Sequence, residues 1–181
     1  GKPAYGVGPG NGPSYIDKSA NVKKSVQLIV NSKSFDNGTL CSSEQSLIIH
    51  KNVKNLVMRE LKINGAYLLD ENEKRLLEKT ISPERGKLNT KIVGKSAKYI
   101  ANLAGFSVPE DTRVLIAEEN EIGYDAPMSI EKLSPILPLY FVNDEEEAIT
   151  IASKILDLGG KGHTCSIHAN DNEIIIKFGL K

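Results

Sequence analysis

The apolar residues of the chain recur with two spacings that alternate from its beginning to its end. Apolar positions three and four residues apart predict amphipathic helices, whereas short apolar runs rich in β-branched residues predict buried strands. Helices are expected over residues 19–32, 53–63, 70–81, 96–104 and 143–158. Strands are expected over residues 14–16, 47–50, 113–117, 135–142 and 164–168. This alternation predicts a three-layer α/β domain in which helices cover both faces of a largely parallel sheet.

Polar residues at the starts of these segments predict where the helices begin. Ser19 is expected to cap the first helix, since a hydroxyl can accept from a free N–H of the first turn. Asp70 followed by Glu73 has the spacing of a capping box. Asn143 with Glu146 gives a similar start to the long helix near the end of the chain.

Two segments need separate treatment, because one expected strand contains prolines and another segment near the end of the chain is rich in β-branched residues. The expected strand 135–142 contains Pro135 and Pro138, which cannot donate to a ladder, so an edge position or a late start is expected. The segment 173–178 has a run of three isoleucines, and this β-branched pattern favours a strand.

Composition and charge narrow the class of protein. A chain of 181 residues is long enough for one domain with its own core. Lys plus Arg and Asp plus Glu number 23 each, so the net charge of zero does not suggest a nucleic acid or an anionic membrane as partner. No apolar run reaches membrane-spanning length and no signal peptide is recognisable. We therefore expect a cytoplasmic protein whose two cysteines stay reduced.

Cys41 lies in the stretch FDNGTLCSSEQ, residues 35–45. It follows an Asn-Gly turn at the end of a helical pattern and precedes the apolar run 47–49. A thiol at such a junction can be exposed on a rigid scaffold, and it becomes a nucleophile as the thiolate. The alternative is a buried structural cysteine, and spacing alone does not decide between the two.

Residues 35–46, FDNGTLCSSEQS, resemble the catalytic-cysteine segment of the aldehyde dehydrogenase superfamily, specifically the CoA-acylating acetaldehyde dehydrogenases. The likeness is greatest to the aldehyde dehydrogenase half of the bifunctional aldehyde–alcohol dehydrogenases. Four further blocks match in order: GKPAYGVGPGN (1–11), AGFSVPEDT (104–112), EKLSPIL (131–137) and GGKGHT (159–164). The resemblance implies the aldehyde dehydrogenase fold, with a helix rather than a strand over 173–178, and we adopt the helix.

The resemblance implies covalent catalysis by Cys41. In this family the thiolate adds to the aldehyde, hydride passes to NAD, and the thiol of coenzyme A (CoA) attacks the resulting thioester. The oxyanion is held by the backbone N–H of the cysteine and by an asparagine amide from another domain. Hydrolytic relatives carry a glutamate at the position that matches Gly6, where it activates water. The glycine therefore indicates acyl transfer to CoA in place of hydrolysis.

The same resemblance assigns candidate roles to two further residues. Glu131 matches the carboxylate that binds the nicotinamide ribose, although by position alone it could be an ordinary surface acid. His163 resembles a histidine near the acylating active site, where it could assist the CoA thiol; a simple loop histidine fits equally well. Cys165 is expected to be packed within a strand, and with His163 and His168 it makes no convincing zinc site. No metal is predicted.

The expected parent protein is larger than this chain. Family members have a nucleotide-binding domain that lies mostly before the GKPAYG block, and a later segment that pairs subunits. Residues 1–181 are therefore expected to form the cysteine-bearing catalytic domain of a homo-oligomeric enzyme, inactive in isolation, whose substrates are a short-chain aldehyde such as acetaldehyde and CoA. The alternatives are a non-catalytic interaction domain of a filament or shell-associated assembly, and an unrelated cysteine hydrolase. The hydrolase lacks a defensible Cys–His–Asp/Asn set.

Overall fold

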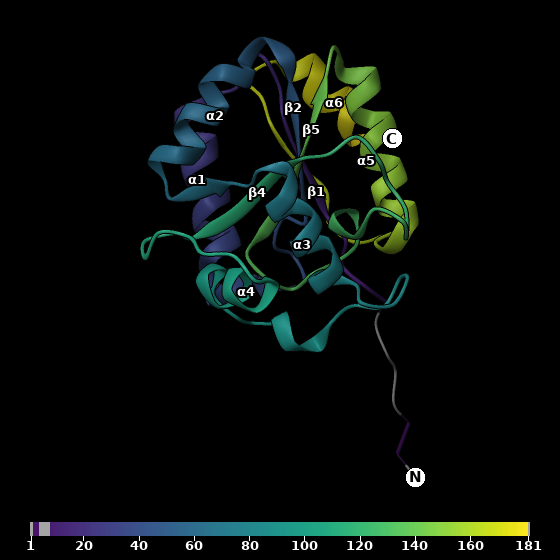
Figure 1. Ribbon diagram of the computed structural model, residues 1–181. Coiled ribbons are helices and arrows are strands. Elements are labelled where there is room, and N and C mark those ends of the chain that lie inside the picture. Colours follow the sequence, from purple (N-terminus) through teal and green to yellow (C-terminus); the bar gives the residue numbers. More distant parts are fainter. Residues whose placement is uncertain (1, 4–7, 181) are drawn as a thin grey trace.

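The computed structural model describes residues 2–3 and 8–180 and contains one six-stranded sheet in which every strand pair is parallel (Figure 1). The order across the sheet is β3-β4-β5-β2-β1-β6. The strands are β1 Pro13–Ile16, β2 Ser46–His50, β3 Ala66–Leu68, β4 Val114–Glu118, β5 Ile136–Val142 and β6 Ser166–His168. The predicted α/β fold with a parallel sheet is confirmed, with β3 as a strand that the sequence pattern did not predict.

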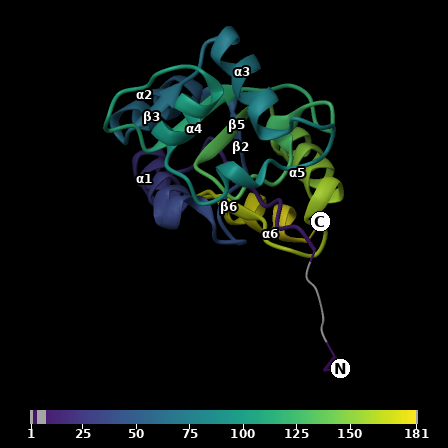
Figure 2. The same ribbon diagram turned by 60° about the horizontal axis from the view of Figure 1, so that its bottom comes forward.

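Six α-helices connect or follow these strands. They are α1 Val22–Ser34, α2 Lys54–Ile63, α3 Glu71–Ile81, α4 Ala97–Ala104, α5 Glu145–Gly159 and α6 Asn172–Gly179. Figure 2 shows α3 and α4 on the opposite side of the molecule from α6 when the lower edge is turned forward. Short 3-10 turns lie at Phe35–Gly38, Lys51–Val53, Thr90–Ile92 and Pro127–Ser129.

The helices form two layers around the sheet, because side chains of successive strand residues point to opposite faces. Apolar residues of α1 and α2 pack with Ile16, Leu47 and Leu137 on one face. On the other face, α5 packs with Tyr15 and Ile48. Residues of α3 and α4 cover the part of that second face formed by β4 and the start of β5. The apolar residues of α1 at three- and four-residue spacings, Val22, Val26, Ile29 and Val30, are buried.

Two predicted helix starts are wrong by one to two residues. The first helix begins at Val22, and Asn21 is the capping residue that accepts from the N–H of Lys24. Ser19 accepts instead from the N–H groups of Asn170 and Asp171, which come from the far end of the chain. Contacts between distant segments thus replaced the local cap.

The long helix shows a similar shift, whereas the third helix follows the prediction. Asp144, not Asn143, caps α5 by accepting from the N–H of Glu147. Asp70 and Glu73 form the predicted capping box of α3, with both reciprocal hydrogen bonds present.

The proline-containing strand is central, so the predicted edge position is wrong. Pro135 directly precedes β5, as a late start requires, but Pro138 lies inside a strand that pairs with both β4 and β2. Six of its seven residues are buried. Burial of this apolar run on both faces outweighs the one donor that the proline lacks.

The C-terminal segment is helical, as the family resemblance implied. Asp171 caps α6 by accepting from the N–H groups of Glu173 and Ile174. On α2, Leu56 belongs to the apolar pattern of the helix, yet its side chain is 39% exposed. In both places, packing against the rest of the molecule outweighed the preference of the local sequence, which favours a strand at 173–178 and a buried Leu56.

Candidate active site at the amino-terminal edge of the sheet

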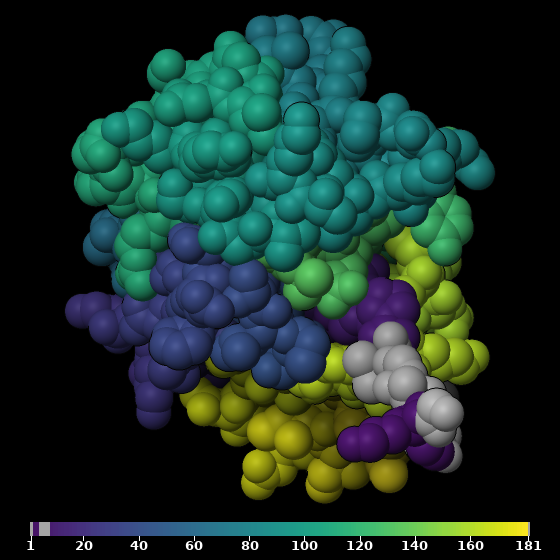
Figure 3. Space-filling view, turned by 90° about the horizontal axis from the view of Figure 1, so that it is seen from below, coloured from purple at the N-terminus to yellow at the C-terminus, as the bar shows by residue number. Residues whose placement is uncertain are grey.

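Four of the sequence blocks that carry candidate chemistry lie directly before strands. Gly10 precedes β1, Cys41 precedes β2, Glu131 precedes β5 and His163 precedes β6. Because all of the strands are parallel, their beginnings share one edge of the sheet. Figure 3 views the molecule from this side, where the blue-violet, light green, purple and yellow-green parts of the chain meet.

Gly10 marks the point at which these blocks come together. A Cβ atom built on Gly10 would lie 2.5 Å from the carbonyl oxygen of Cys41, 3.2 Å from Oε1 of Glu131 and 3.2 Å from Cε1 of His163. Only glycine allows such close approach at this position. The fold therefore brings together the three residues that the sequence singled out.

The fifth block, residues 104–112, is not part of this group in the contacts of the described residues. Gly105 ends α4 with a left-handed conformation. The carbonyl of Asp111 faces Gly65, near the start of β3. This block thus supports the outer part of the sheet. Gly6, which indicated acyl transfer to CoA, lies outside the described residues.

Cys41 is exposed on the turn between α1 and β2, which excludes the alternative of a buried structural cysteine. The preceding turn has three consecutive residues with positive φ: Asp36 (46°), Asn37 (51°) and Gly38 (73°). Asn and Asp tolerate this region better than most residues, yet each such conformation typically costs about 1–3 kcal/mol. The surrounding contacts hold the strained turn in place.

The facing loop, which carries Glu131, is strained as well. Leu133 has a φ of 46°, and its carbonyl accepts from the N–H of Gly94. A Cβ on Gly38 would lie 2.9 Å from the carbonyl group of Ser134, so the two strained loops pack directly against each other. Asn37 donates to the carbonyl of Gly94 and ties both loops to the same segment.

Glu131 is half-buried and fixed by one of its oxygens. Oε1 accepts from the N–H of Gly10 at 2.8 Å. Among the described residues, no hydrogen bond is recorded for Oε2. The residue borders a hollow of about 210 Å³ whose other lining residues include Pro9, Leu88 and Tyr124. A carboxylate held in this way can still accept hydrogen bonds from a ligand.

His163 is exposed, and its Nδ1 accepts from the N–H of Thr164 at 2.8 Å. In a neutral imidazole that accepts at Nδ1, the proton resides on Nε2. The imidazole therefore presents Nε2 as a donor.

Cys165 is exposed rather than packed as predicted. It lines a hollow of about 300 Å³ together with His163 and Phe178. Although one side of the residue is open, the protein around the sulfur raises the pKa of its thiol to about 11 by desolvation. Cys165 is therefore protonated at neutral pH, and a protonated thiol is a poor nucleophile.

A group of buried charges that the sequence did not predict lies below these loops. Lys33 and Lys132 are both fully buried, and both contact Gln45. Burial lowers the pKa of Lys33 to about 7, against the opposing influence of Glu44 and Glu131. Burial also lowers the pKa of Lys132, and Lys33 lowers it further. Burial raises the pKa of the Glu44 carboxyl.

One feature of the sequence could have revealed Lys33. It continues the buried stripe of the first helix, since Val26, Ile29, Val30 and Lys33 recur at three- and four-residue spacings. A lysine on the apolar side of a helix is unusual enough to indicate a buried charge. Lys132 has no such periodic signal, because it lies in a loop.

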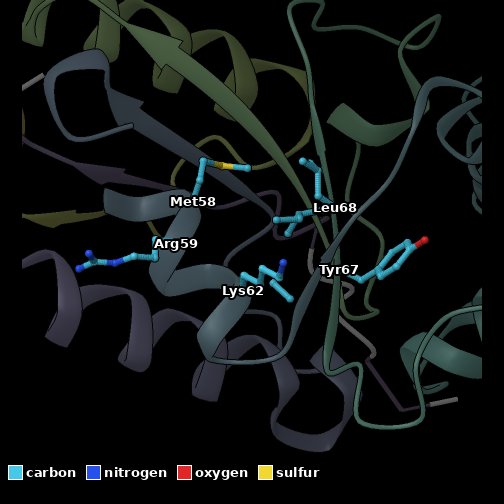
Figure 4. Close-up of a pocket in the computed structure, with 7 residues that line it drawn as sticks. Met58, Arg59, Lys62, Tyr67 and Leu68 are labelled. Carbon is cyan, nitrogen blue, oxygen red and sulfur yellow. The ribbon is translucent and has the colours of Figure 1, made fainter. Parts of the chain in front are cut away.

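A hollow of about 480 Å³ lies in another part of the molecule, between α2 and β3 (Figure 4). Met58, Arg59 and Lys62 extend from α2, and Tyr67 and Leu68 extend from β3. None of the candidate site residues lines this hollow. Despite its volume, it is therefore separate from the candidate site at the amino-terminal edge.

Two kinds of feature are absent from the described part of the chain. No group of three or more His, Cys, Asp or Glu side chains there is arranged to hold a metal ion. In the same part, no helix combines the length and the apolar character needed to span a membrane.

Comparisons with known proteins place the chain. No protein-family model matches it. The aldehyde-alcohol dehydrogenase of Clostridium acetobutylicum is 45% identical over 171 residues, which cover 94% of this chain and 20% of that protein. The chain thus spans about a fifth of the length of this curated relative.

Solved structures extend the similarity to the fold. An acetylating aldehyde dehydrogenase from Geobacillus thermoglucosidasius is 52% identical with a TM-score of 0.96, covering 100% of this chain and 40% of that one. A propionaldehyde dehydrogenase from Rhodopseudomonas palustris, solved with bound CoA and an acylated cysteine, is 30% identical with a TM-score of 0.85 over 99% of this chain and 40% of that chain. By sequence and by structure, the chain belongs with the acetylating aldehyde dehydrogenases, of which it matches one segment.

Proposed function

We propose that this chain is the cysteine-bearing catalytic part of an NAD-dependent acylating aldehyde dehydrogenase. The reaction interconverts a short-chain aldehyde, with acetaldehyde as the first candidate, and CoA with the corresponding acyl-CoA. The observation that carries the proposal is the convergence of Cys41, Glu131 and His163 around Gly10, with the thiol of Cys41 exposed. A related propionaldehyde dehydrogenase with bound CoA and an acylated cysteine supports the same chemistry.

Cys41 would act as the nucleophile. Its thiolate sulfur forms a bond to the carbonyl carbon of the aldehyde, and the carbonyl oxygen takes the negative charge. The backbone N–H of Cys41 is the donor that this chain can offer to the oxyanion, with a second donor expected from the remainder of the parent protein. After oxidation, the acyl group is a thioester on Cys41. Attack by the CoA thiolate then releases acyl-CoA and returns Cys41 as a thiolate.

Glu131 would hold the nicotinamide cofactor, which accepts the hydride when it is bound. The N–H of Gly10 fixes one carboxylate oxygen, so the other can accept from ribose hydroxyls. Charge-assisted hydrogen bonds of this kind contribute roughly 1.5–3 kcal/mol each. Micromolar binding needs about 8 kcal/mol, so Glu131 alone is insufficient. The remaining contacts would come from the nucleotide-binding domain of the same polypeptide.

His163 would assist the acyl transfer from the CoA side. Because its Nδ1 accepts from the N–H of Thr164, neutral His163 offers Nε2–H as a donor. In this tautomer it is suited to stabilise the CoA thiolate sulfur by a hydrogen bond. It is not suited to remove the proton of the thiol at the same nitrogen.

The requirement for CoA is the sharpest test of this function. Gly6 places no carboxylate at the position where hydrolytic relatives activate water, so the acyl group should wait for a thiol. With the full-length enzyme, we expect steady-state formation of NADH from acetaldehyde to depend on CoA. A parallel assay with NADP separates the two cofactors. Equal turnover with and without CoA would contradict the proposed acyl acceptor.

A further inference from the structure

Asp36 and Asn37 share an unusual backbone conformation but use their side chains differently. Their φ angles are 46° and 51°, both in the left-handed region. The carboxylate of Asp36 is exposed and accepts a hydrogen bond from the hydroxyl of Thr39 in the same turn. The amide of Asn37 is half-buried and donates at 3.1 Å to the carbonyl of Gly94, 57 residues further along the chain. The side chain of Asp36 thus acts within the turn, whereas that of Asn37 connects the turn to a distant segment.

Gly94 lies on a segment that the core holds firmly. Ile92, two residues before it, is fully buried among residues of α3 and α4. The carbonyl of Ile92 accepts from the N–H of Lys95. Ser96 then caps α4 by accepting from the N–H of Tyr99. The carbonyl of Gly94 is therefore a fixed point for a loop that bonds to it.

Gly94 joins two loops of the candidate site, which we call the cysteine loop (residues 35–45) and the carboxylate loop (residues 130–135). Its carbonyl accepts from Asn37 of the cysteine loop. Its N–H donates at 3.0 Å to the carbonyl of Leu133 of the carboxylate loop. The two hydrogen bonds hold the loops side by side on one residue, so a shift of one loop relative to the other would break one of them.

The cysteine loop also approaches Gly94 closely. A Cβ atom built on Gly94 would lie 3.1 Å from the side-chain methyl of Thr39, which is two residues before Cys41. On the other side of the loop, the carbonyl of Cys41 lies against Gly10. Cys41 itself is exposed, so the position of its thiol depends on how these backbone contacts hold the loop.

We propose that Asn37 is a positioning residue that fixes the cysteine loop on Gly94 and thereby sets where the thiol of Cys41 lies relative to the carboxylate loop. This inference rests on the proposed roles of Cys41 as the nucleophile and Glu131 as a cofactor ligand. Hydride transfer needs the reacting carbon close to the nicotinamide, and a displacement of about 1 Å can cost on the order of 100-fold in rate. Glu131 keeps its own bond to the N–H of Gly10. Loss of the Asn37 amide should therefore displace the nucleophile and leave cofactor binding intact.

The alternative is that Asn37 serves only its own backbone. Asparagine tolerates the left-handed region better than most residues, and glycine adopts it without steric cost. Replacement by glycine therefore preserves the turn but removes the amide. Aspartate also tolerates the turn and has nearly the same shape, yet an ionised carboxylate cannot donate to the carbonyl of Gly94. These two replacements separate the two explanations.

The test compares Asn37→Gly and Asn37→Asp with the parent in the full-length enzyme. Asp36→Gly is the matched control, because it adds the same flexibility at the neighbouring position of the turn and keeps the bond to Gly94. Steady-state formation of NADH from acetaldehyde and CoA gives kcat and the KM for NAD. Hydrogen exchange, followed by mass spectrometry of the peptides that contain residues 35–45 and 89–97, reports how firmly the loop is held without requiring turnover. Thermal melting shows that each variant is folded.

We expect both Asn37 variants to lower kcat by roughly tenfold to hundredfold, with the KM for NAD unchanged. Hydrogen exchange in both peptides should become roughly threefold to tenfold faster, as for the loss of one net hydrogen bond. Asp36→Gly should match the parent in kcat and in the exchange of residues 89–97.

If Asn37 serves only its own backbone, the variants give another result. Parent-like kcat or parent-like exchange in Asn37→Gly, or equal changes in Asp36→Gly, would overturn the inference. If Asn37→Gly does not fold, Asn37→Asp decides by the same criteria. The proposed function fails separately, through a parent enzyme that forms no NADH from acetaldehyde and CoA. Exchange alone then decides whether Asn37 holds the loop.

Discussion

The two edges of the parallel sheet are built in opposite ways. At the carboxyl-terminal edge, where open α/β sheets commonly bind ligands, five helices follow strands. The first turns of α1, α3, α5 and α6 are capped by Asn21, Asp70, Asp144 and Asp171, whereas α2 has no side-chain cap. In the four capped helices, N–H groups that could have held an anion are thereby occupied. This edge serves the stability of the fold.

The amino-terminal edge is formed by loops with strained backbone and buried charge. Positive φ angles occur at Asp36, Asn37 and Leu133, and two fully buried lysines lie beneath them. Such features cost free energy and persist only where the surrounding structure enforces them. The contrast agrees with the active site proposed at the amino-terminal edge, and four predictions test it.

The largest effect on activity is expected from replacing Cys41. In the full-length enzyme, Cys41→Ala should lower the rate of aldehyde oxidation on the order of several thousand-fold or more, because the covalent route is lost. Cys165→Ala is the matched control and should retain activity. Steady-state NADH formation measures both. If Cys165→Ala is folded but as inactive as Cys41→Ala, the assignment of Cys41 as the nucleophile is contradicted.

The second largest effect on activity is expected at Gly10, where the Cys41, Glu131 and His163 segments meet. Gly10→Ala places a Cβ 2.5 Å from the carbonyl of Cys41, so the loop must shift, and displacement by about 1 Å can cost on the order of 100-fold in rate. Gly8→Ala is a close control, since a Cβ there meets nothing within 4 Å. Measured kcat/KM values of the two variants decide, and equal values would show that Gly10 does not set the geometry.

The third prediction concerns what the buried charge costs. Desolvation of the Lys33 ammonium group outweighs its attraction to Glu44 and Glu131, so Lys33→Met should melt at a higher temperature than the parent at pH 6. Burial lowers the pKa of Lys33 from its usual 10.5 to about 7, so between these values the unfolded chain binds more protons. The stability of the parent therefore rises with pH across this window.

Melting curves recorded at pH 6, 8 and 10 test this directly. The advantage of Lys33→Met should be largest at pH 6 and should shrink toward pH 10. The exposed control Lys24→Met should show no such trend. A constant difference at all three pH values would mean that Lys33 does not titrate in this range.

The smallest effect is expected at the carboxyl-terminal edge, where removing the helix cap Asp70 should lower stability without changing activity. Asp70→Ala removes both hydrogen bonds that Asp70 accepts at the start of α3 and should cost about 1 kcal/mol of unfolding free energy. Asp70→Asn keeps an acceptor and should lose less. Activity per folded molecule should stay unchanged in both variants, as measured by kcat/KM. A large loss of activity would extend the functional site to this edge.

Local sequence patterns determined much of the architecture. The spacing of apolar residues predicted five of the six strands and the first five helices, and Asp70 with Glu73 predicted a capping box that is present. These features depend on residues that are close in sequence, so periodicity records them. The segment 35–45 placed the thiol between a helix and a strand but left open whether it is buried, and the structure shows Cys41 exposed. The family resemblance was needed to choose a helix for 173–178.

Only the tertiary structure decided which distant residues meet. The central place of β5, the contact of Ser19 with Asn170 and the meeting of Cys41, Glu131 and His163 at Gly10 all join segments that are far apart in sequence. The same holds for Lys33 and Lys132, which come together at Gln45. Burial and charge at such points depend on neighbours that a local pattern does not contain. The order of the parallel strands supplies those neighbours, because it gathers at one edge the beginnings of strands as far apart in sequence as β1 at Pro13 and β6 at Ser166.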